Sequence, residues 1–222
     1  MELRDKVVVV TGAASGIGKA LAGRFCAEGA KRIVAVDLDD AGARATAGAV
    51  GGVAMAADVS RESDVARVIE KTEDDVGQID LFCSNAGIAA GSELDSDDAE
   101  WQRSWEVNVM AHVYAARHLV PRMLARGGGY FLNTSSAAGL LNQIGGAAYG
   151  VTKHAAVGFG EWLALSYAHR GIRVSLLCPQ AVRTAMTTGD AAEGGVGVAA
   201  ASGDGMMEPE DVAEIVVEGL RE

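Results

Sequence analysis

The sequence predicts an α/β fold, and two patterns along its 222 residues support this. Short apolar runs alternate with longer amphipathic stretches, and a glycine-rich turn directly follows the first apolar run. Most of the runs are nearly continuous, which is typical of strands that are buried on both faces of a parallel sheet. We therefore expect a Rossmann-like, doubly wound parallel sheet with helices on both faces, forming three α/β/α layers.

The elements should follow one another in βαβ order within a single domain over residues 1–222. Ser60 should cap the third helix, because a serine hydroxyl accepts a hydrogen bond from a first-turn amide. We expect strands at residues 7–10, 33–36, 53–57, 79–83, 130–133 and 174–178, and helices at about 17–28, 41–49, 62–76, 99–125, 149–168 and 209–221.

Composition and charge exclude several function classes. Lys and Arg number 19 against 30 Asp and Glu, and a net charge of −11 argues against a protein that binds nucleic acid. No apolar run approaches the roughly 18 residues of a membrane span, and the N-terminus has no apolar signal core. Three scattered cysteines form no disulfide framework, and no Cys or His cluster has metal-ligand spacing. We expect a cytoplasmic protein without a metal site.

A long Gly- and Ala-rich stretch follows the sixth expected strand. Loops of this length are uncommon inside compact domains unless they have a function. Since ligands bind beyond the carboxyl ends of the strands in such a sheet, residues 186–207 are expected to form a mobile loop over a substrate. A plain surface linker is the alternative.

The glycine-rich turn at residues 11–18 predicts a nucleotide site. Gly12 permits the tight turn, Gly16 lets the backbone approach a pyrophosphate, and Gly18 lets the helix pack on the strand. The phosphates would then meet backbone N–H groups at a helix N-terminus.

Asp37 supports this prediction and indicates which nucleotide binds. It ends the second strand, nineteen residues after Gly18. A carboxylate there hydrogen-bonds the adenosine ribose hydroxyls and repels a 2′-phosphate, so NAD is favoured over NADP. Lys31 and Arg32 are counter-evidence, although they precede the strand. The alternative is that Asp37 is only a turn residue.

Tyr149 and Lys153 predict a proton-transfer site. They lie four residues apart, so a helix would place them on one face. Tyrosine titrates near pH 10, and a nearby cation favours the phenolate and lowers that pKa. Such a pair can exchange a proton with a substrate hydroxyl or carbonyl. Ser136 lies thirteen residues upstream.

With these residues assembled, the chain closely resembles the short-chain dehydrogenase/reductase family from about residue 6 to 184. The family's elements occur in order and at its spacing. They are the glycine turn at 11–18, Asp37, Asp58 with Val59, Asn85-Ala86-Gly87, Asn108, Ser135 with Ser136, Tyr149 with Lys153, and Pro179 with Thr184.

The resemblance implies four catalytic residues. Tyr149 would be the general acid/base, and Ser136 would hydrogen-bond the substrate oxygen. Lys153 would lower the tyrosine pKa and bind the nicotinamide ribose. Asn108 would anchor a water molecule that links Lys153 to solvent; an ordinary amide at a helix bend is the alternative.

The resemblance also implies the residues that bind the cofactor. Asp58 would contact the adenine amino group, Ile17 the pyrophosphate, and Val182 and Thr184 the nicotinamide side. The whole set is Gly12, Ser15, Gly16, Ile17, Gly18, Asp37, Leu38, Asp58, Val59, Asn85, Ala86, Gly87, Tyr149, Lys153, Pro179, Val182 and Thr184.

The implied function is hydride transfer between NAD(H) and a secondary alcohol or ketone. The helices at 99–125 and 149–168 would pair across a two-fold axis in a homodimer or homotetramer. The alternatives are an NADPH-dependent ketoreductase and a non-catalytic nucleotide-binding module.

Two features depart from the family pattern. Gln180 stands where the family usually has glycine, so a conformation that only glycine tolerates is excluded there. The family also usually has a seventh strand after the helix at 209–221. Without it an open sheet edge is expected, and the alternative is that the sequence is incomplete.

Overall fold

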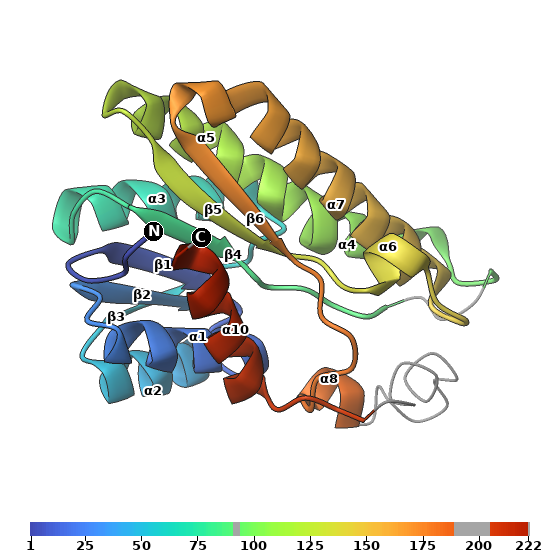
Figure 1. Cartoon of the computed structure of the whole chain (residues 1–222). Helices are drawn as coiled ribbons and strands as arrows, with labels where there is room; N and C mark the ends of the chain where they lie inside the picture. Colours follow the sequence, from blue (N-terminus) through green and yellow to red (C-terminus); the bar gives the residue numbers. More distant parts are fainter. Residues whose placement is uncertain (91–93, 189–204, 222) are drawn as a thin grey trace.

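The computed structural model describes residues 1–90, 94–188 and 205–221, which form one domain around a single six-stranded sheet (Figure 1). All neighbouring strands are parallel, in the order β3-β2-β1-β4-β5-β6. The order reverses between β1 and β4, which makes the sheet doubly wound and confirms the predicted fold class. The strands are β1 Val7–Thr11, β2 Arg32–Asp37, β3 Val53–Ala56, β4 Leu81–Ser84, β5 Gly129–Thr134 and β6 Ile172–Leu177.

The helices occupy the predicted positions, with two additions. The short helices α6 and α8 were not predicted, and the expected helix at 99–125 consists of three consecutive elements, one of them π-helical. The helical elements are α1 Gly16–Ala27, α2 Asp40–Val50, α3 Glu62–Asp75, α4 Asp98–Trp105, the π-helix η1 Glu106–Met110, α5 Ala111–Ala125, α6 Ala138–Leu141, α7 Ala147–Tyr167, the 3₁₀ helix η2 Ala168–Arg170, α8 Ala185–Thr188 and α10 Pro209–Arg221.

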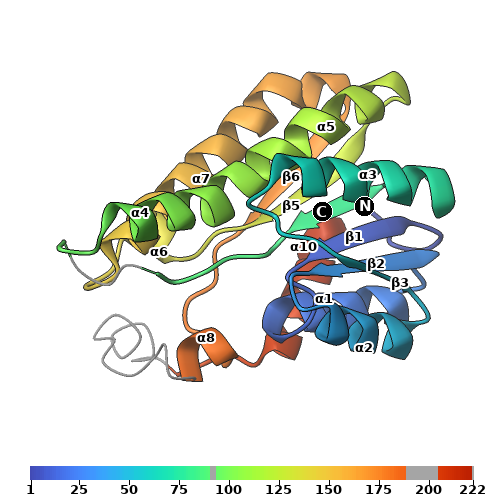
Figure 2. The ribbon, with the colours of Figure 1, turned by 180° about the vertical axis from the view of Figure 1, so that it is seen from behind.

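Two apolar cores sandwich the sheet. Helices α1, α2 and α10 cover one face of the sheet, and α3, α5 and α7 cover the other (Figures 1 and 2). Val8 and Val10 belong to the core on the first face, whereas Val9, Phe82 and Phe131 belong to the core on the second. All five side chains are at most 1% exposed. Fully burying each one contributes roughly 1.5–3 kcal/mol, and covering both faces explains why the strands read as continuous apolar runs.

The expected cap of α3 is wrong. Arg61 occupies the N-cap position, and Ser60 instead donates its hydroxyl to Asp58 Oδ1 over 2.7 Å. Asp64, in the first turn, accepts a hydrogen bond from the Asp58 amide at 2.9 Å. The Asp58 carboxylate thus competes for the hydroxyl that the sequence assigns to the helix.

β6 lies at one edge of the sheet and pairs only with β5 among the described strands. Of the loop predicted at 186–207, residues 189–204 lie outside the described part of the chain. The two described stems are joined, because Val182 and Met207 form a parallel bridge and the Arg183 amide donates to the Met207 carbonyl at 2.9 Å.

Within the described ranges, no helix is both long enough and apolar enough to cross a membrane. Among the same residues, no group of three or more His, Cys, Asp or Glu side chains is placed to hold a metal ion.

His112 is an unusual core residue of α5. It is 2% exposed, and neither ring nitrogen has a hydrogen-bond partner among the described residues. Burial, with a smaller contribution from the Lys153 charge, lowers the pKa of His112 to about 3. The imidazole is therefore neutral in the folded protein at neutral pH.

We predict that His112→Leu makes the protein less sensitive to acid. Histidine in the unfolded chain titrates near pH 6.5, so below this pH the unfolded state binds more protons and the wild type loses stability. Urea unfolding at pH 7 and pH 5 should show that the free energy of unfolding falls less in the variant than in the wild type. Well below pH 6.5, the slopes of this free energy against pH should differ by about 1.4 kcal/mol per pH unit. An identical pH dependence in the two proteins would contradict this prediction.

Candidate functional site

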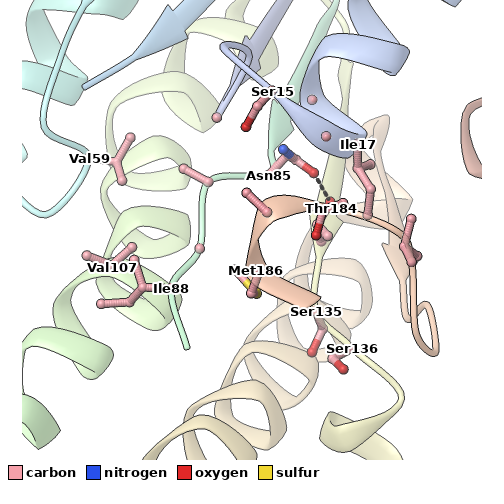
Figure 3. A pocket seen from close by; sticks show the side chains of 18 of the residues that line it. Ser15, Ile17, Val59, Asn85, Ile88, Val107, Ser135, Ser136, Thr184 and Met186 are labelled. Atoms are coloured by element: carbon pink, nitrogen blue, oxygen red, sulfur yellow. Dashed lines mark hydrogen bonds between the residues drawn. The ribbon is translucent and has the colours of Figure 1, made fainter. Parts of the chain in front are cut away.

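A cavity of about 400 Å³ opens beyond the carboxyl ends of the strands (Figure 3). Its size suits a small-molecule site, and its position is where ligands bind in open α/β sheets. Ser136 lines it, whereas Asn108 does not. All the expected cofactor-binding residues line it, namely Gly12, Ser15, Gly16, Ile17, Gly18, Asp37, Leu38, Asp58, Val59, Asn85, Ala86, Gly87, Tyr149, Lys153, Pro179, Val182 and Thr184.

The glycine turn is fastened to the end of β2. Asp37 Oδ2 accepts a hydrogen bond from the Ala14 amide at 2.9 Å, and Oδ1 accepts one from the Asp39 amide at 3.0 Å. A Cβ at Gly18 would collide with the Gly12 carbonyl, so only glycine permits this close approach of α1 to the turn. Asp37 is therefore a turn residue and also lines the cavity. Its expected place in a nucleotide site and the alternative of a turn residue do not exclude each other.

Hydrogen bonds from Thr11 and Asn85 join the ends of three strands. Thr11 Oγ1 accepts from the amides of Asn85 and Ala86, at 2.9 and 3.1 Å, and the Asn85 side chain donates to the Thr11 carbonyl at 3.0 Å. Thr134 Oγ1 donates to Asn85 Oδ1 at 3.1 Å, the bond drawn from Asn85 in Figure 3. The segments that leave β1, β4 and β5 are thereby fixed relative to one another.

Asn108 does not line the cavity, but it binds the segment after β4 that does. It is fully buried in the π-helical segment, donates to the Ile88 carbonyl at 2.9 Å and to Thr152 Oγ1 at 3.1 Å, and accepts from the Ile88 amide at 2.9 Å. A Cβ at Gly87 would lie 3.2 Å from both Asn108 Oδ1 and Lys153 Nζ. The asparagine thus joins the helix to the β4 loop close to the ammonium.

The two neighbouring serines have different surroundings. Ser135 is 3% exposed and donates to the Lys153 carbonyl at 2.8 Å, so it fastens β5 to α7. Ser136 is half-buried at the cavity wall and accepts from the Ala138 amide at 3.1 Å, at the start of α6. Figure 3 shows the Ser135 and Ser136 side chains next to each other at the end of the cavity that follows β5.

Tyr149 and Lys153 face the cavity from the first turns of α7. The Lys153 ammonium is 5.6 Å from the centre of the Tyr149 ring and donates to the Thr134 carbonyl at 3.3 Å. Burial lowers the pKa of Lys153 to about 8. Burial also raises the pKa of Tyr149, and a hydrogen bond with Ser136 offsets part of that rise.

The pKa of Tyr149 is raised, whereas the family resemblance implies that Lys153 lowers it. The physical reason is that burial favours the neutral form of both groups. A lysine whose pKa is close to 8 is also only partly charged just above neutrality, so it is a weaker source of positive potential.

Several lining residues were not predicted, including Arg103, Thr134 and Met186. Thr134 could have been found, because it ends β5 directly before the serine pair. Arg103 had no sequence signal, since it reads as an ordinary charged residue on a helix surface. Gln180 lines the cavity without a left-handed backbone, because only Asp5 and Asn142 among the described non-glycine residues have positive φ.

Comparisons with known proteins agree with this geometry. The family model for short chain dehydrogenase matches residues 6–194. The chain is 40% identical to the 1-deoxy-11-beta-hydroxypentalenate dehydrogenase of Streptomyces exfoliatus over 99% of its own length and 81% of that protein. It is 35% identical to the meso-2,3-butanediol dehydrogenase of Serratia marcescens, over 85% of its own length and 76% of that enzyme.

A solved short-chain dehydrogenase/reductase from Burkholderia phymatum, in complex with NAD, superimposes with a TM-score of 0.89. The match covers 100% of this chain and 87% of that one, at 28% identity. Sequence motifs, sheet topology and the family match therefore agree that the chain belongs to the short-chain dehydrogenase/reductase family of oxidoreductases.

Proposed function

We propose that the protein transfers a hydride between NAD(H) and a secondary alcohol or ketone, with Tyr149 as the general acid/base. The observation that carries the proposal is the shared cavity, where Ser136, Tyr149 and Lys153 meet the glycine turn and Asp37. The nicotinamide supplies or accepts the hydride when bound, and the protein supplies orientation and proton transfer.

The proton step follows from the burial of Tyr149. Because burial raises its pKa, the phenol is protonated at neutral pH and can donate to a carbonyl oxygen as that carbonyl is reduced. The resulting phenolate is stabilised by Ser136 and by the Lys153 ammonium when it is protonated. In the oxidative direction the phenolate takes the proton of the alcohol. Well-placed acid/base catalysis of this kind contributes roughly 10²–10⁴ in rate.

The cavity offers groups for each part of NAD. The start of α1 would present backbone amides to the pyrophosphate, and the hydrogen bonds from Ala14 and Asp39 hold the Asp37 side chain where the ribose would lie. A carboxylate at this position disfavours a 2′-phosphate, which supports NAD over NADP. We assign Asp58 and Val59 to the adenine, Leu38 to the adenosine, and Pro179, Val182 and Thr184 to the nicotinamide half.

We also propose that the protein is a cytoplasmic homodimer or homotetramer. The three cysteines are all free, which suits a reducing compartment. On α7, the apolar side chains of Val151, Trp162 and Leu165 are 47%, 53% and 84% exposed, and a Cβ at Gly158 would meet no atom within 4 Å. A second copy that packs on this helix would remove these apolar groups from water.

Tyr149→Phe should abolish turnover while leaving NADH binding nearly unchanged, because it removes only the proton donor. The assay follows NADH oxidation over a panel of ketones, with binding measured by NADH fluorescence. Tyr167→Phe is the matched control, since Tyr167 lies in the same helix but outside the cavity lining and packs against Trp162. Wild-type turnover in Tyr149→Phe would refute the assigned role.

Lys153→Met should stabilise the protein at pH 7 and stabilise it less at pH 9.5. The pKa of Lys153 is about 8 in the folded state and about 10.5 in the unfolded state, so the wild type gains stability as pH rises through this window. Below pH 8 the buried ammonium is unfavourable, and methionine removes it. Urea unfolding at both pH values measures the difference, with exposed Lys19→Met as control. If the gain in the free energy of unfolding from Lys153→Met is as large at pH 9.5 as at pH 7, the prediction is wrong.

Asp37→Ala should reduce the preference for NADH over NADPH, because it removes the carboxylate that meets the ribose. Fluorescence titrations with both cofactors give the ratio of their dissociation constants, which we expect to change by at least tenfold. Asp40→Ala is the control, because Asp40 carries the same charge three residues away and pairs with Arg44. If the ratio stays the same in Asp37→Ala, the ribose role is excluded.

A further inference from the structure

We infer that Arg103 is a further cofactor-binding residue, whose guanidinium lies against the adenine base. This inference rests on the proposed function, since it requires that the cavity holds an adenine dinucleotide. Arg103 is the only residue of α4 among the described residues that line the cavity. No sequence motif includes it.

The contacts of Arg103 place it at the adenine end of the cavity. Its Nη1 is 3.7 Å from Asp58 Oδ2 and 3.4 Å from Ser60 Oγ, so the side chain reaches from α4 to the segment after β3. Asp58 and Val59, from this segment, line the same cavity as Asp37. Arg103 therefore lines the cavity next to the segment that follows β3.

The chemistry of this end favours a flat, uncharged ring over a phosphate. Asp37 and Asp58 both place carboxylates there, and a phosphate would be repelled by both. Leu38 is 66% exposed and offers an apolar surface that a base would cover. A guanidinium is planar and weakly hydrated and stacks well on aromatic rings. Both contacts of Arg103 use Nη1, at one corner, which orients the group and leaves its flat face for the base.

Arg61 provides a matched comparison. Its Nε is also 3.7 Å from Asp58 Oδ2, but its side chain is 73% exposed and does not line the cavity. Burial raises the pKa of Asp58, but the hydrogen bonds with Ser60 and the charges of Arg103 and Arg61 bring it below its usual value. The two arginines thus share the task of holding the carboxylate, and only Arg103 also faces the base.

The test compares Arg103→Gln with Arg61→Gln in the full chain. Fluorescence titration measures the dissociation constant for NADH, and displacement of NADH measures that for ADP-ribose, which keeps the adenosine, the pyrophosphate and the second ribose but lacks the nicotinamide. Arg103→Gln should weaken both ligands by the same factor, about fivefold. Arg61→Gln should change either by less than twofold. Melting temperatures should stay close to that of the wild type, because the Arg103 side chain is 45% exposed.

Each other outcome overturns the inference in a recognisable way. Equal weakening by both variants would mean that Arg103 acts only through the charge of Asp58. A parallel titration with NADPH that shows weakening of NADPH without weakening of NADH would identify a 2′-phosphate clamp, and unchanged affinities for all three ligands would exclude any contact. If the wild type binds NADH, these results leave the proposed function intact. A wild type that binds neither NADH nor ADP-ribose would overturn the proposed function as well.

Discussion

The Thr11 hydroxyl joins the carboxyl ends of β1 and β4, and the Asn85 side chain joins that pair to β5. The site depends on this small network because each strand carries a different part of it. β1 leads into the glycine turn, β4 into the segment that Asn108 supports, and β5 into the serine pair. Parallel strands deliver all these segments to one edge of the sheet, and the hydrogen bonds fix how far apart they stand.

The groups that we propose to be catalytic are placed at a cost to stability. Lys153 is 3% exposed, and its ammonium donates to the Thr134 carbonyl without a carboxylate partner among the described residues. Burial alone lowers its pKa, which means that the folded chain disfavours the charge that the proposed reaction uses. Functional sites commonly keep such unfavourable groups, and the two apolar cores on either side of the sheet offset them.

Most of the fold could be predicted because the pattern of apolar runs depends directly on burial. Strands covered on both faces are nearly continuous apolar runs, as β1 and β4 are, and all six strands lie within a few residues of their expected bounds. The misses have physical reasons. The helices α6 and α8 have four residues each, too few for a period of 3.6 to show. The π-helical turn at Glu106–Met110 follows from the tertiary contacts of Asn108, which no local pattern encodes.

The site itself could be predicted where residues follow strands at fixed spacing, as Asp37 and Ser136 do. Arg103 could not, because it reaches the cavity only when α4 is packed near the segment after β3. The sequence also could not give the direction of the Tyr149 pKa. Spacing places a lysine beside the phenol, but burial determines the protonation state of both groups.

The most direct test of the proposed chemistry is to follow the hydride itself. The wild-type protein would be incubated with NADH carrying deuterium at the transferable C4 position and with a panel of open-chain and cyclic ketones, and the alcohols analysed by mass spectrometry. We predict that the wild type forms an alcohol with deuterium on the carbinol carbon and that Tyr149→Phe forms none. Firm NADH binding with no deuterium transferred to any ketone would contradict it and indicate a non-catalytic nucleotide-binding module.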